Sequence, residues 1–440
     1  MDRRTCFRDF AQYCTLNVLG MLALSCYILA DTYFVANALG QDGLAALNLA
    51  IPVYSFIHGT GLMLGMGGAT RFSILKHQGR ENESCVVFTH VLTIAAIFAG
   101  CFFACGGLFA QHLATWLGAE GAVLPMTQTY IQVLCFFSPA FLLNDLLLCF
   151  VRNDGAPQRA MVAMVSGSLS NIVLDYLFMA PLNLGIFGAV FATGLAPLIS
   201  LGILSPFFLR RRNTFYPVPC RPSPSLVGLC TGAGIPSLVT EVSSGVVMIV
   251  FNFILLYLQG SLGVAAYGVV ANLSLVVLAI FTGIAQGIQP LLSRYWGTGV
   301  PTGIGFALRY AMITVGVVSV ALNLLVSIWA GPIASIFNES GDPALQATAV
   351  KGLRLYFTAF PWAGWNIVLS MYFTSTAYPR PAHAISLLRG FLLIIPLAFL
   401  LPAFWGITGL WLAFPLTEVF VFLLACLLYQ QRKRHLDFSS

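Results

Sequence analysis

The sequence predicts an all-helical integral membrane protein, with twelve transmembrane helices in two parallel six-helix repeats around a central cavity. Three observations predict this class. Hydrophobic residues make up 58% of the 440-residue chain and charged residues 8%, with a mean hydropathy of +0.88, whereas soluble proteins carry about 25% charged residues. Apolar stretches of membrane-spanning length follow one another along the chain, and the second half of the sequence repeats positions of the first.

Each apolar stretch has about 20 residues or more, the length that a helix needs to cross a bilayer. The stretches are too long and too evenly apolar for membrane β-strands, which alternate in polarity over about 10 residues. The predicted spans are 12–35, 44–70, 84–111, 124–150, 160–181, 186–209, 228–258, 263–291, 304–330, 347–374, 383–403 and 406–429.

Basic residues predict which loops face the cytoplasm, because cytoplasmic loops retain Lys and Arg. They precede the first span and follow every second span. The loops on the opposite side carry mainly acidic residues such as Asp42 and Glu120, with Lys351 and Arg354 as the exceptions. Both termini are therefore expected to be cytoplasmic. This topology accounts for the net charge of +6, so the charge gives no reason to expect a nucleic-acid partner.

The repeat is a duplication whose two copies lie about 220 residues apart, a spacing that indicates two similar structural units. Matched positions include Gly40 and Gly260, Pro139 and Pro361, Pro157 and Pro379, and Gly185 and Gly406. Six spans per copy is an even number, so the second copy enters the membrane in the same orientation as the first.

The repeat also sets the expected domain organisation. We expect an N-terminal half at 1–209 and a C-terminal half at 227–440. A cytoplasmic linker at 210–226, rich in Arg and Pro, is long enough to let the halves move. Pro139, Pro236 and Pro361 lie inside spans and are expected to kink them.

Acidic side chains inside spans cost about 2.5 to 3.5 kcal/mol on insertion scales and therefore mark candidate sites. Asp31 lies about five residues, roughly 8 Å, below the outer end of its span. Asp175 lies at a similar depth, with Asn171 one helical turn deeper on the same face. These three residues form the candidate cation or proton site, because two neighbouring carboxylates resist double ionisation and one can then exchange protons. The alternative is that each acid caps a kink or satisfies a buried amide.

Two further acids fall near the middle of the membrane in the second repeat. Glu241 lies about thirteen residues into its span and Glu418 about twelve residues into its own. They are candidates for binding a cationic substrate or for a second proton step, although Glu418 could equally bridge two helices by hydrogen bonding. Asp145 and His58 are interpreted as residues with local structural roles.

The sequence lacks the motifs of common enzymes and ATP-driven pumps. Its three lysines, Lys76, Lys351 and Lys433, do not follow a glycine, so no Walker A motif is present. H-E-x-x-H and G-x-S-x-G are also absent. The cysteines form no C-x-x-C pair and no His–Cys cluster at metal-binding spacing. We therefore expect neither an enzyme nor a bound cofactor.

A series of motifs runs through both repeats. In the first repeat they are LADTYFVANALGQDGLAALNLAIP, VRNDGAPQRAM, SNIVLDYLFM and GIFGAVFATGLA; in the second they are AGIPSLVTE, GVAAYGV and GIAQGIQPLLSRYWGTG. In this order and spacing they resemble the multidrug and toxic compound extrusion (MATE) family, of the multidrug/oligosaccharidyl-lipid/polysaccharide exporter superfamily. The resemblance covers essentially the whole chain.

This resemblance implies a bacterial inner-membrane antiporter that works by alternating access as a monomer, with membrane lipid around it. It would export small organic cations, driven by inward H⁺ or Na⁺. The family's N-terminal acidic site falls on Asp31, Asn171 and Asp175, and its acid in the seventh helix falls on Glu241. Some members carry an acid in the tenth helix that helps form a second Na⁺ site, whereas FPWAGWNIVLSMYF has none. That departure shifts the expected ion coupling to the N-terminal carboxylates.

Two other functions stay open. A flippase for lipid-linked saccharides of the same superfamily would share the fold, but such proteins tend to have a basic cavity and the mid-membrane ionisable residues here are mostly acidic. A non-transporting membrane receptor would be expected to carry small soluble domains or long loops, and this sequence has neither.

Overall fold

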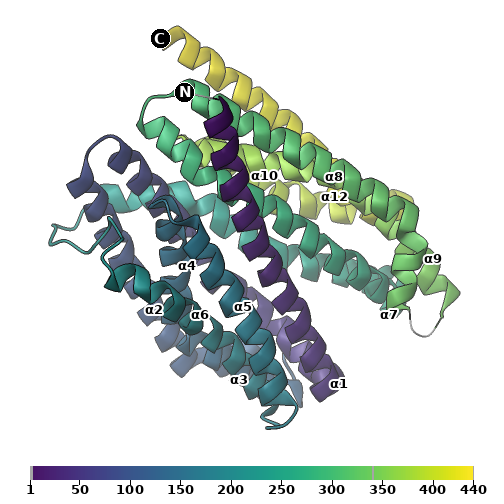
Figure 1. Cartoon of the computed structure of the whole chain (residues 1–440). Coiled ribbons are helices and arrows are strands. Elements are labelled where there is room, and N and C mark those ends of the chain that lie inside the picture. The colour runs from purple at the N-terminus through teal and green to yellow at the C-terminus, as the bar shows by residue number, and fades with distance from the viewer. Residues whose placement is uncertain (1–2, 339–340, 440) are drawn as a thin grey trace. The chain divides into compact units, whose positions relative to one another are not determined.

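The computed structural model describes residues 3–338 and 341–439, with side chains described up to Arg434, and within these ranges it contains helices and no strand (Figure 1). The helices of the first repeat are α1 (Arg3–His77), α2 (Glu81–Trp116), α3 (Val123–Phe136), α4 (Ser138–Asn153), α5 (Pro157–Met179) and α6 (Gly185–Leu209). Those of the second are α7 (Pro224–Gly297), α8 (Pro301–Phe337), α9 (Pro343–Tyr356), α10 (Phe360–Ser375), α11 (Pro379–Leu387) and α12 (Ile394–Ser439). A 3₁₀ turn at Phe357–Ala359 precedes α10, and a π-helical turn at Leu388–Leu392 follows α11.

Glycines interrupt the three longest helical segments. α1 and α7 contain 75 and 74 residues, several times the ~20 residues that cross a bilayer. The chain leaves helical geometry at Gly40 (φ 63°), Gly260 (φ 64°) and Gly406 (φ 55°). These φ values lie in the left-handed region that favours glycine. Gly40 and Gly260 are repeat partners, so the duplication has kept a backbone turn as well as a residue type.

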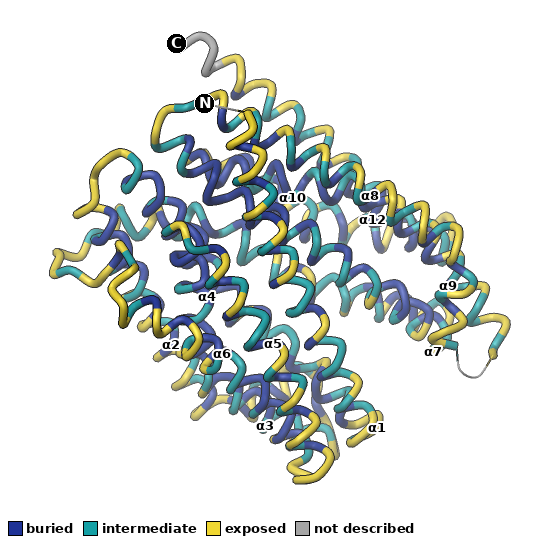
Figure 2. Tube along the Cα trace, in the orientation of Figure 1, coloured by how far each residue is buried: buried dark blue, intermediate teal, exposed yellow. Residues whose placement is uncertain are grey.

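The fold has the twelve helices that the sequence predicts. Among the described residues, seven helices are long and apolar enough to span a membrane, and α3 with α4 makes an eighth through a 50° bend. The breaks at Gly40, Gly260 and Gly406 divide α1, α7 and the segment Pro379–Arg434 each into a first and a second arm. The remaining spans come from these second arms and from α9 with α10. Figure 2 shows exposed residues along many of the helices. Large apolar side chains such as Leu108, Ile328 and Phe404 are among the exposed residues, as expected where the surrounding solvent is lipid.

Two of the three predicted proline kinks are breaks between helices. α3 ends just before Pro139, and the 3₁₀ turn precedes Pro361; each proline lies in the first turn of the next helix. A proline is tolerated there because its missing N–H would have had no partner within the helix. At Pro236, in contrast, α7 continues without a break.

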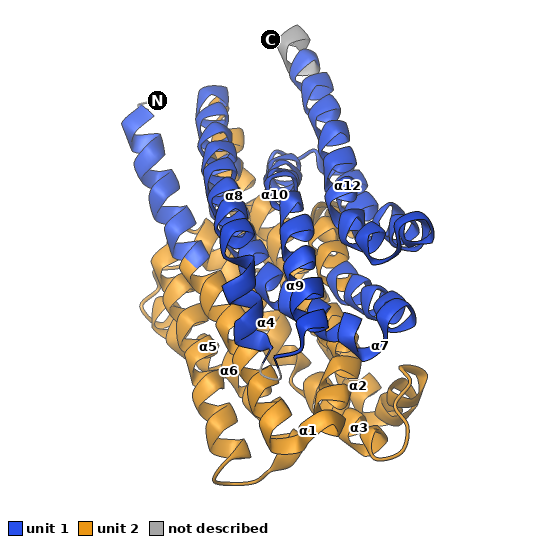
Figure 3. Ribbon diagram, turned by 90° about the vertical axis from the view of Figure 1, so that its right-hand side faces the viewer, with its two compact units in different colours: residues 1–18, 243–292, 301–440 blue, residues 19–242, 293–300 orange. Residues whose placement is uncertain are grey.

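The helices pack into two compact units (Figure 3). Unit 1 contains residues 1–18, 243–292 and 301–440, and unit 2 contains residues 19–242 and 293–300. α1 and α7 therefore each contribute to both units. In unit 2, α5 packs against α6 and α2 against α3, whereas in unit 1 α10 packs against α8 and α12. The candidate N-terminal site lies wholly within unit 2.

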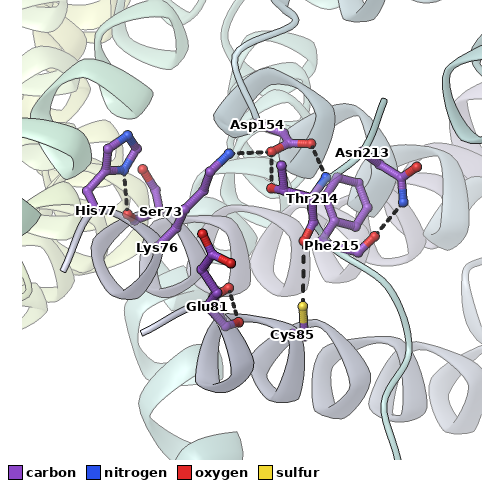
Figure 4. A network of polar contacts seen from close by, with 10 residues as sticks. Ser73, Lys76, His77, Glu81, Cys85, Asp154, Asn213, Thr214 and Phe215 are labelled. Atoms are coloured by element: carbon purple, nitrogen blue, oxygen red, sulfur yellow. Dashed lines mark hydrogen bonds and ion pairs between the residues drawn. The ribbon is translucent and has the colours of Figure 1, made fainter. Parts of the chain in front are cut away.

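The segment that joins α6 to α7 packs onto unit 2 (Figure 4). The buried carboxylate of Asp154, at the end of α4, accepts hydrogen bonds from Lys76 Nζ at 2.6 Å, from the backbone N–H of Thr214 at 2.8 Å and from the Thr214 hydroxyl. The buried ring of Phe215 contacts the rings of Phe72, Phe88, Phe150 and Phe208. The first part of the predicted linker is thus held on the N-terminal half, and α7 begins at Pro224, within the linker's predicted range.

Candidate functional site

The structure brings Asp31, Asn171 and Asp175 together inside unit 2. Asp31 projects from the first arm of α1, and the other two project from α5, where the spacing of four residues places them on one face. With its amide turned so that both ends find partners, Asn171 donates to Asp175 Oδ2 at 2.9 Å and accepts from the backbone N–H of Thr193 on α6 at 3.1 Å. All three site residues are buried, and the two carboxylates are close enough to interact electrostatically.

Two tyrosines that the sequence analysis did not single out complete this site. Tyr130 on α3 is buried and interacts with both Asp31 and Thr193. Tyr27 lies one helical turn before Asp31 on α1 and is also buried. Its i, i+4 spacing from Asp31 is a signal that the sequence contains. Tyr130 has no such signal, because only tertiary packing brings α3 to α1.

One oxygen of each carboxylate remains without a hydrogen-bond partner among the described residues. These atoms are Asp31 Oδ1 and Asp175 Oδ1. A buried polar atom left unsatisfied costs about 1 to 3 kcal/mol, so the site gains stability from anything that supplies a proton or a positive charge. Carboxylate, amide and hydroxyl oxygens suit a proton or a small hard cation. The arrangement fits reversible cation uptake by a site closed off from solvent.

His58 and Asp145 pair with each other in the same unit. His58 Nδ1 lies 2.9 Å from Asp145 Oδ2, joining the second arm of α1 to α4. The structural interpretation from the sequence treated the two residues separately, and each has its partner in the other. Glu241, on the first part of α7, lies beside Gly59 of α1, as a Cβ built on that glycine would be 3.1 Å from the Glu241 Cβ.

Glu418 is held in a buried ion pair in unit 1. Its Oε1 accepts from Arg389 Nη2 at 2.8 Å and Nε at 3.1 Å, and its Oε2 accepts from Asn366 Nδ2 at 2.7 Å. The sequence analysis passed over Arg389, although an arginine inside the predicted span 383–403 is itself a signal. A role for Glu418 in substrate or proton binding stays a prediction. Its contacts are those of the helix-bridging alternative.

The fold and these buried ionisable groups define a multi-pass membrane transport protein, and comparison with known proteins identifies its family. The MatE family model matches residues 18–177 and 236–400, so the chain belongs to the MatE family. It is accordingly a membrane transporter and not an enzyme.

Relatives with assigned names align along nearly the full chain. The multidrug export protein MepA of Staphylococcus saprophyticus is 24% identical over 413 residues, which cover 93% of this chain and 90% of that protein. An FAD transporter of Shewanella oneidensis is 26% identical over 430 residues, covering 94% and 92%. The outward-facing structure of a multidrug resistance MATE family transporter of the MOP superfamily superposes with a TM-score of 0.89 at 21% identity, covering 98% and 96%. At that identity the structural likeness establishes the fold alone.

Proposed function

We propose that this protein is a secondary active antiporter that exports organic cations and xenobiotics in exchange for inward H⁺ or Na⁺. It works by alternating access, as a monomer with both termini on the cytoplasmic side of a bacterial inner membrane. The name of the staphylococcal relative supports multidrug export. The basic residues at every second loop support the orientation.

The observation that carries this proposal is the buried pair of carboxylates at Asp31 and Asp175, each with one unpartnered oxygen. When both are ionised, the site holds two negative charges that little water can screen. Uptake of H⁺ or Na⁺ neutralises part of that charge. A conformation that closes over the neutralised site is then favoured over one that exposes it, and this differential affinity is what drives a conformational change.

Asn171 and Tyr130 connect this change to the surrounding helices. Asn171 links the Asp175 carboxylate to the backbone of α6, and Tyr130 links Asp31 to Thr193. A change in charge on either acid alters contacts among α1, α3, α5 and α6. We propose that the N-terminal half rearranges through these contacts, with α1 bending, and releases substrate outside.

The substrate class has a second candidate. The Shewanella relative, named an FAD transporter, is as similar to this chain as the multidrug exporters are. A flavin nucleotide is anionic and would need basic groups near its phosphates. Glu241 and the Asp31 site are acidic, which favours a cationic substrate. The saccharide-lipid flippase is disfavoured for the same reason.

The direct test is transport by the purified protein in vesicles of neutral lipid loaded with a fluorescent dye cation. A pH gradient and a Na⁺ gradient are imposed separately, and FAD replaces the dye in a parallel series. We expect gradient-driven dye movement with one of the two ions, and its loss in Asp31→Asn. Asp42→Asn, which removes an exposed acid of α1 just after the break at Gly40, is the matched control and should transport as the parent protein does.

Three results would each contradict part of the proposal. Dye movement that responds to neither gradient would exclude coupled antiport. Undiminished coupled movement in Asp31→Asn would remove the site from the mechanism. FAD movement without dye movement would replace the organic cation by a flavin nucleotide as substrate.

A further inference from the structure

The His58–Asp145 pair lies in unit 2, separate from the Asp31 site, and its two side chains are also largely buried. The two side chains are 14% and 7% exposed and are joined by the 2.9 Å contact between Nδ1 and Oδ2. With Nδ1 engaged, the proton that His58 gains or loses is carried by Nε2. No described residue hydrogen-bonds to that nitrogen.

Glycines on α1 allow Asp145 to approach His58. A Cβ built on Gly61 would lie 2.6 Å from Asp145 Oδ2, and one built on Gly65 would lie 3.0 Å from the Asp145 backbone oxygen. Both glycines are therefore needed for α4 to pack this closely against α1. Because Gly61 lies three residues after His58, it shares a helix face with the imidazole. The close approach of the two helices is what places the carboxylate on the ring nitrogen.

Two tyrosines link this pair to the Asp31 site along α1. The ring of Tyr54 stacks on the imidazole of His58, with centroids 5.7 Å apart and planes 10° from parallel. The Tyr54 hydroxyl hydrogen-bonds to the Tyr27 hydroxyl at 2.8 Å. Tyr27 in turn lies one turn before Asp31. Tyr54 and Tyr27 thus lie between the two ionisable sites in unit 2.

The charged groups around His58 are acidic. Asp145 faces it from α4 and Glu241 from the first part of α7, while Tyr54 flanks it on α1. Arg152, farther along α4, contacts Cys149 instead. One imidazole is therefore paired with one carboxylate and lies near a second, since Glu241 packs beside the neighbouring residue Gly59. Its protonation lowers the local negative charge by one, and its deprotonation makes the same place more attractive to a cation.

We propose that His58 and Asp145 form a second proton-binding site of the N-terminal half, whose proton is displaced when a cationic substrate binds near Glu241. This rests on the proposed antiport of organic cations. On uptake, the Nε2 lone pair forms an N–H bond with a proton from water, and the imidazolium is held by Asp145. On release, that bond breaks and the proton returns to water. The step is specific for protons, because hard cations such as Na⁺ bind oxygen ligands rather than an imidazolium.

Proton counting during substrate binding tests this proposal. The purified protein is titrated with a dye cation in weakly buffered detergent solution containing a pH indicator, at several pH values. Binding and proton release are linked reciprocally, so the parent protein should release protons as dye binds. His58→Gln should release one proton fewer at the pH of greatest release. His112→Gln, which alters an exposed histidine near the end of α2, should match the parent.

A second pair of variants separates proton binding from mere packing. Asp145→Asn removes the counter-charge but keeps the side-chain shape. Gly61→Ala keeps both ionisable groups and displaces the carboxylate from the imidazole. In both variants the pH profile of proton release should move to lower pH, because an imidazolium without its carboxylate loses its proton more readily. A purely structural role for the pair would change stability and leave this profile in place.

The outcomes distinguish this proposal from the one on which it rests. If His58→Gln folds and releases as many protons as the parent, the second site is wrong and coupled antiport stands. If His58→Gln does not fold, an unchanged profile in Asp145→Asn and Gly61→Ala overturns the proposal equally. If the parent protein moves dye under neither gradient in vesicles, the antiport function itself is wrong.

Discussion

In the N-terminal half, Asp31 and Asp175 each keep a buried oxygen without a hydrogen-bond partner among the described residues, whereas in the C-terminal half Glu418 is bound by Arg389 and Asn366. The two aspartates can therefore bind an added cation, whereas Glu418 is already paired with the Arg389 guanidinium. Neutralising Glu418 with a proton would leave the Arg389 guanidinium, 12% exposed, without its counter-charge. Leaving one member of a buried ion pair without its counter-charge is strongly unfavourable.

The two halves share a backbone plan and differ in the side chains placed on it. The position 220 residues after Asp31 is Phe251, which is fully buried and stacks on Tyr267. The position 221 residues before Glu418 is Pro197. The duplication therefore explains the shared turns at Gly40 and Gly260, and it does not duplicate the acids. We propose reversible cation binding in the N-terminal half because the carboxylate oxygens without a hydrogen-bond partner among the described residues, Asp31 Oδ1 and Asp175 Oδ1, lie there.

The largest effect is expected from Asp175→Asn. This substitution removes one of the two charges and leaves an amide that can still hydrogen-bond to Asn171. Gradient-driven dye efflux from vesicles should fall on the order of 100-fold, expressed as a ratio of rates, while the melting temperature changes little. Efflux that stays within a factor of about two of the parent would show that the unpaired oxygens do not carry the coupling.

Breaking the ion pair of the C-terminal half should act on stability instead. Arg389→Met leaves the Glu418 carboxylate, 1% exposed, without its counter-charge, and breaking a buried pair in this way costs about 3 to 5 kcal/mol. The double variant Arg389→Met, Glu418→Gln removes both charges and keeps an acceptor for Asn366 Nδ2. Thermal unfolding in detergent should show most of the loss recovered in the double variant.

The same double variant can also break the comparison between the halves. Its ratio of ions to dye moved should equal that of the parent protein if Glu418 only bridges helices. A changed ratio would show that Glu418 takes part in ion coupling, as the sequence analysis allowed. Both halves would then contribute ionisable groups to the transport mechanism.

An intermediate effect, on local stability, is expected in the linker. Its first part packs on the N-terminal half through Phe215. Phe215→Ala removes the ring that packs among Phe72, Phe88 and Phe150. Loss of a buried phenylalanine costs about 3 to 5 kcal/mol, and local opening increases accordingly. Trypsin should then cleave at the arginines of the linker at least 10-fold faster. Tyr216→Ala, at a neighbouring residue that is 53% exposed, is the control and should be cleaved at the parent rate.

The sequence predicted the helices well because hydropathy and length act locally. The predicted spans 186–209 and 160–181 correspond to α6 (Gly185–Leu209) and α5 (Pro157–Met179). The Asp31, Asn171 and Asp175 cluster could also be predicted, since depth in the membrane follows from residue count along each helix. All three residues also stood out individually, as polar groups in apolar surroundings.

Pairings between distant residues could not be predicted in the same way. His58 and Asp145 are 87 residues apart, and their contact depends on how closely α4 approaches α1. Glycines such as Gly61 and Gly65 permit a close approach of two helices, but they do not indicate which helix approaches. The packing of Phe215 could not be predicted either. A proline-rich segment predicted as a cytoplasmic linker has no periodicity from which a buried face can be recognised.

The smallest effect is expected at two equivalent helix ends. α4 and α10 have the same hydrogen-bond pattern at their C-terminal ends. The N–H of Ala156 donates to Val151 O at 3.1 Å, and the N–H of Tyr378 donates to Phe373 O at 3.0 Å. The residue in the left-handed conformation is Gly155 (φ 90°) in the first repeat and Ala377 (φ 56°) in the second.

Ala377→Gly should therefore stabilise the protein, because it relieves about 1 to 2 kcal/mol of backbone strain against about 0.4 to 1 kcal/mol of added chain entropy in the unfolded state. Gly155→Ala should destabilise it by a similar net amount. Thermal unfolding should show shifts of opposite sign, each of about one or two degrees in a chain of this length. Shifts of the same sign would mean that the two helix ends are not equivalent, and that the repeat has diverged in its backbone as well as in its acids.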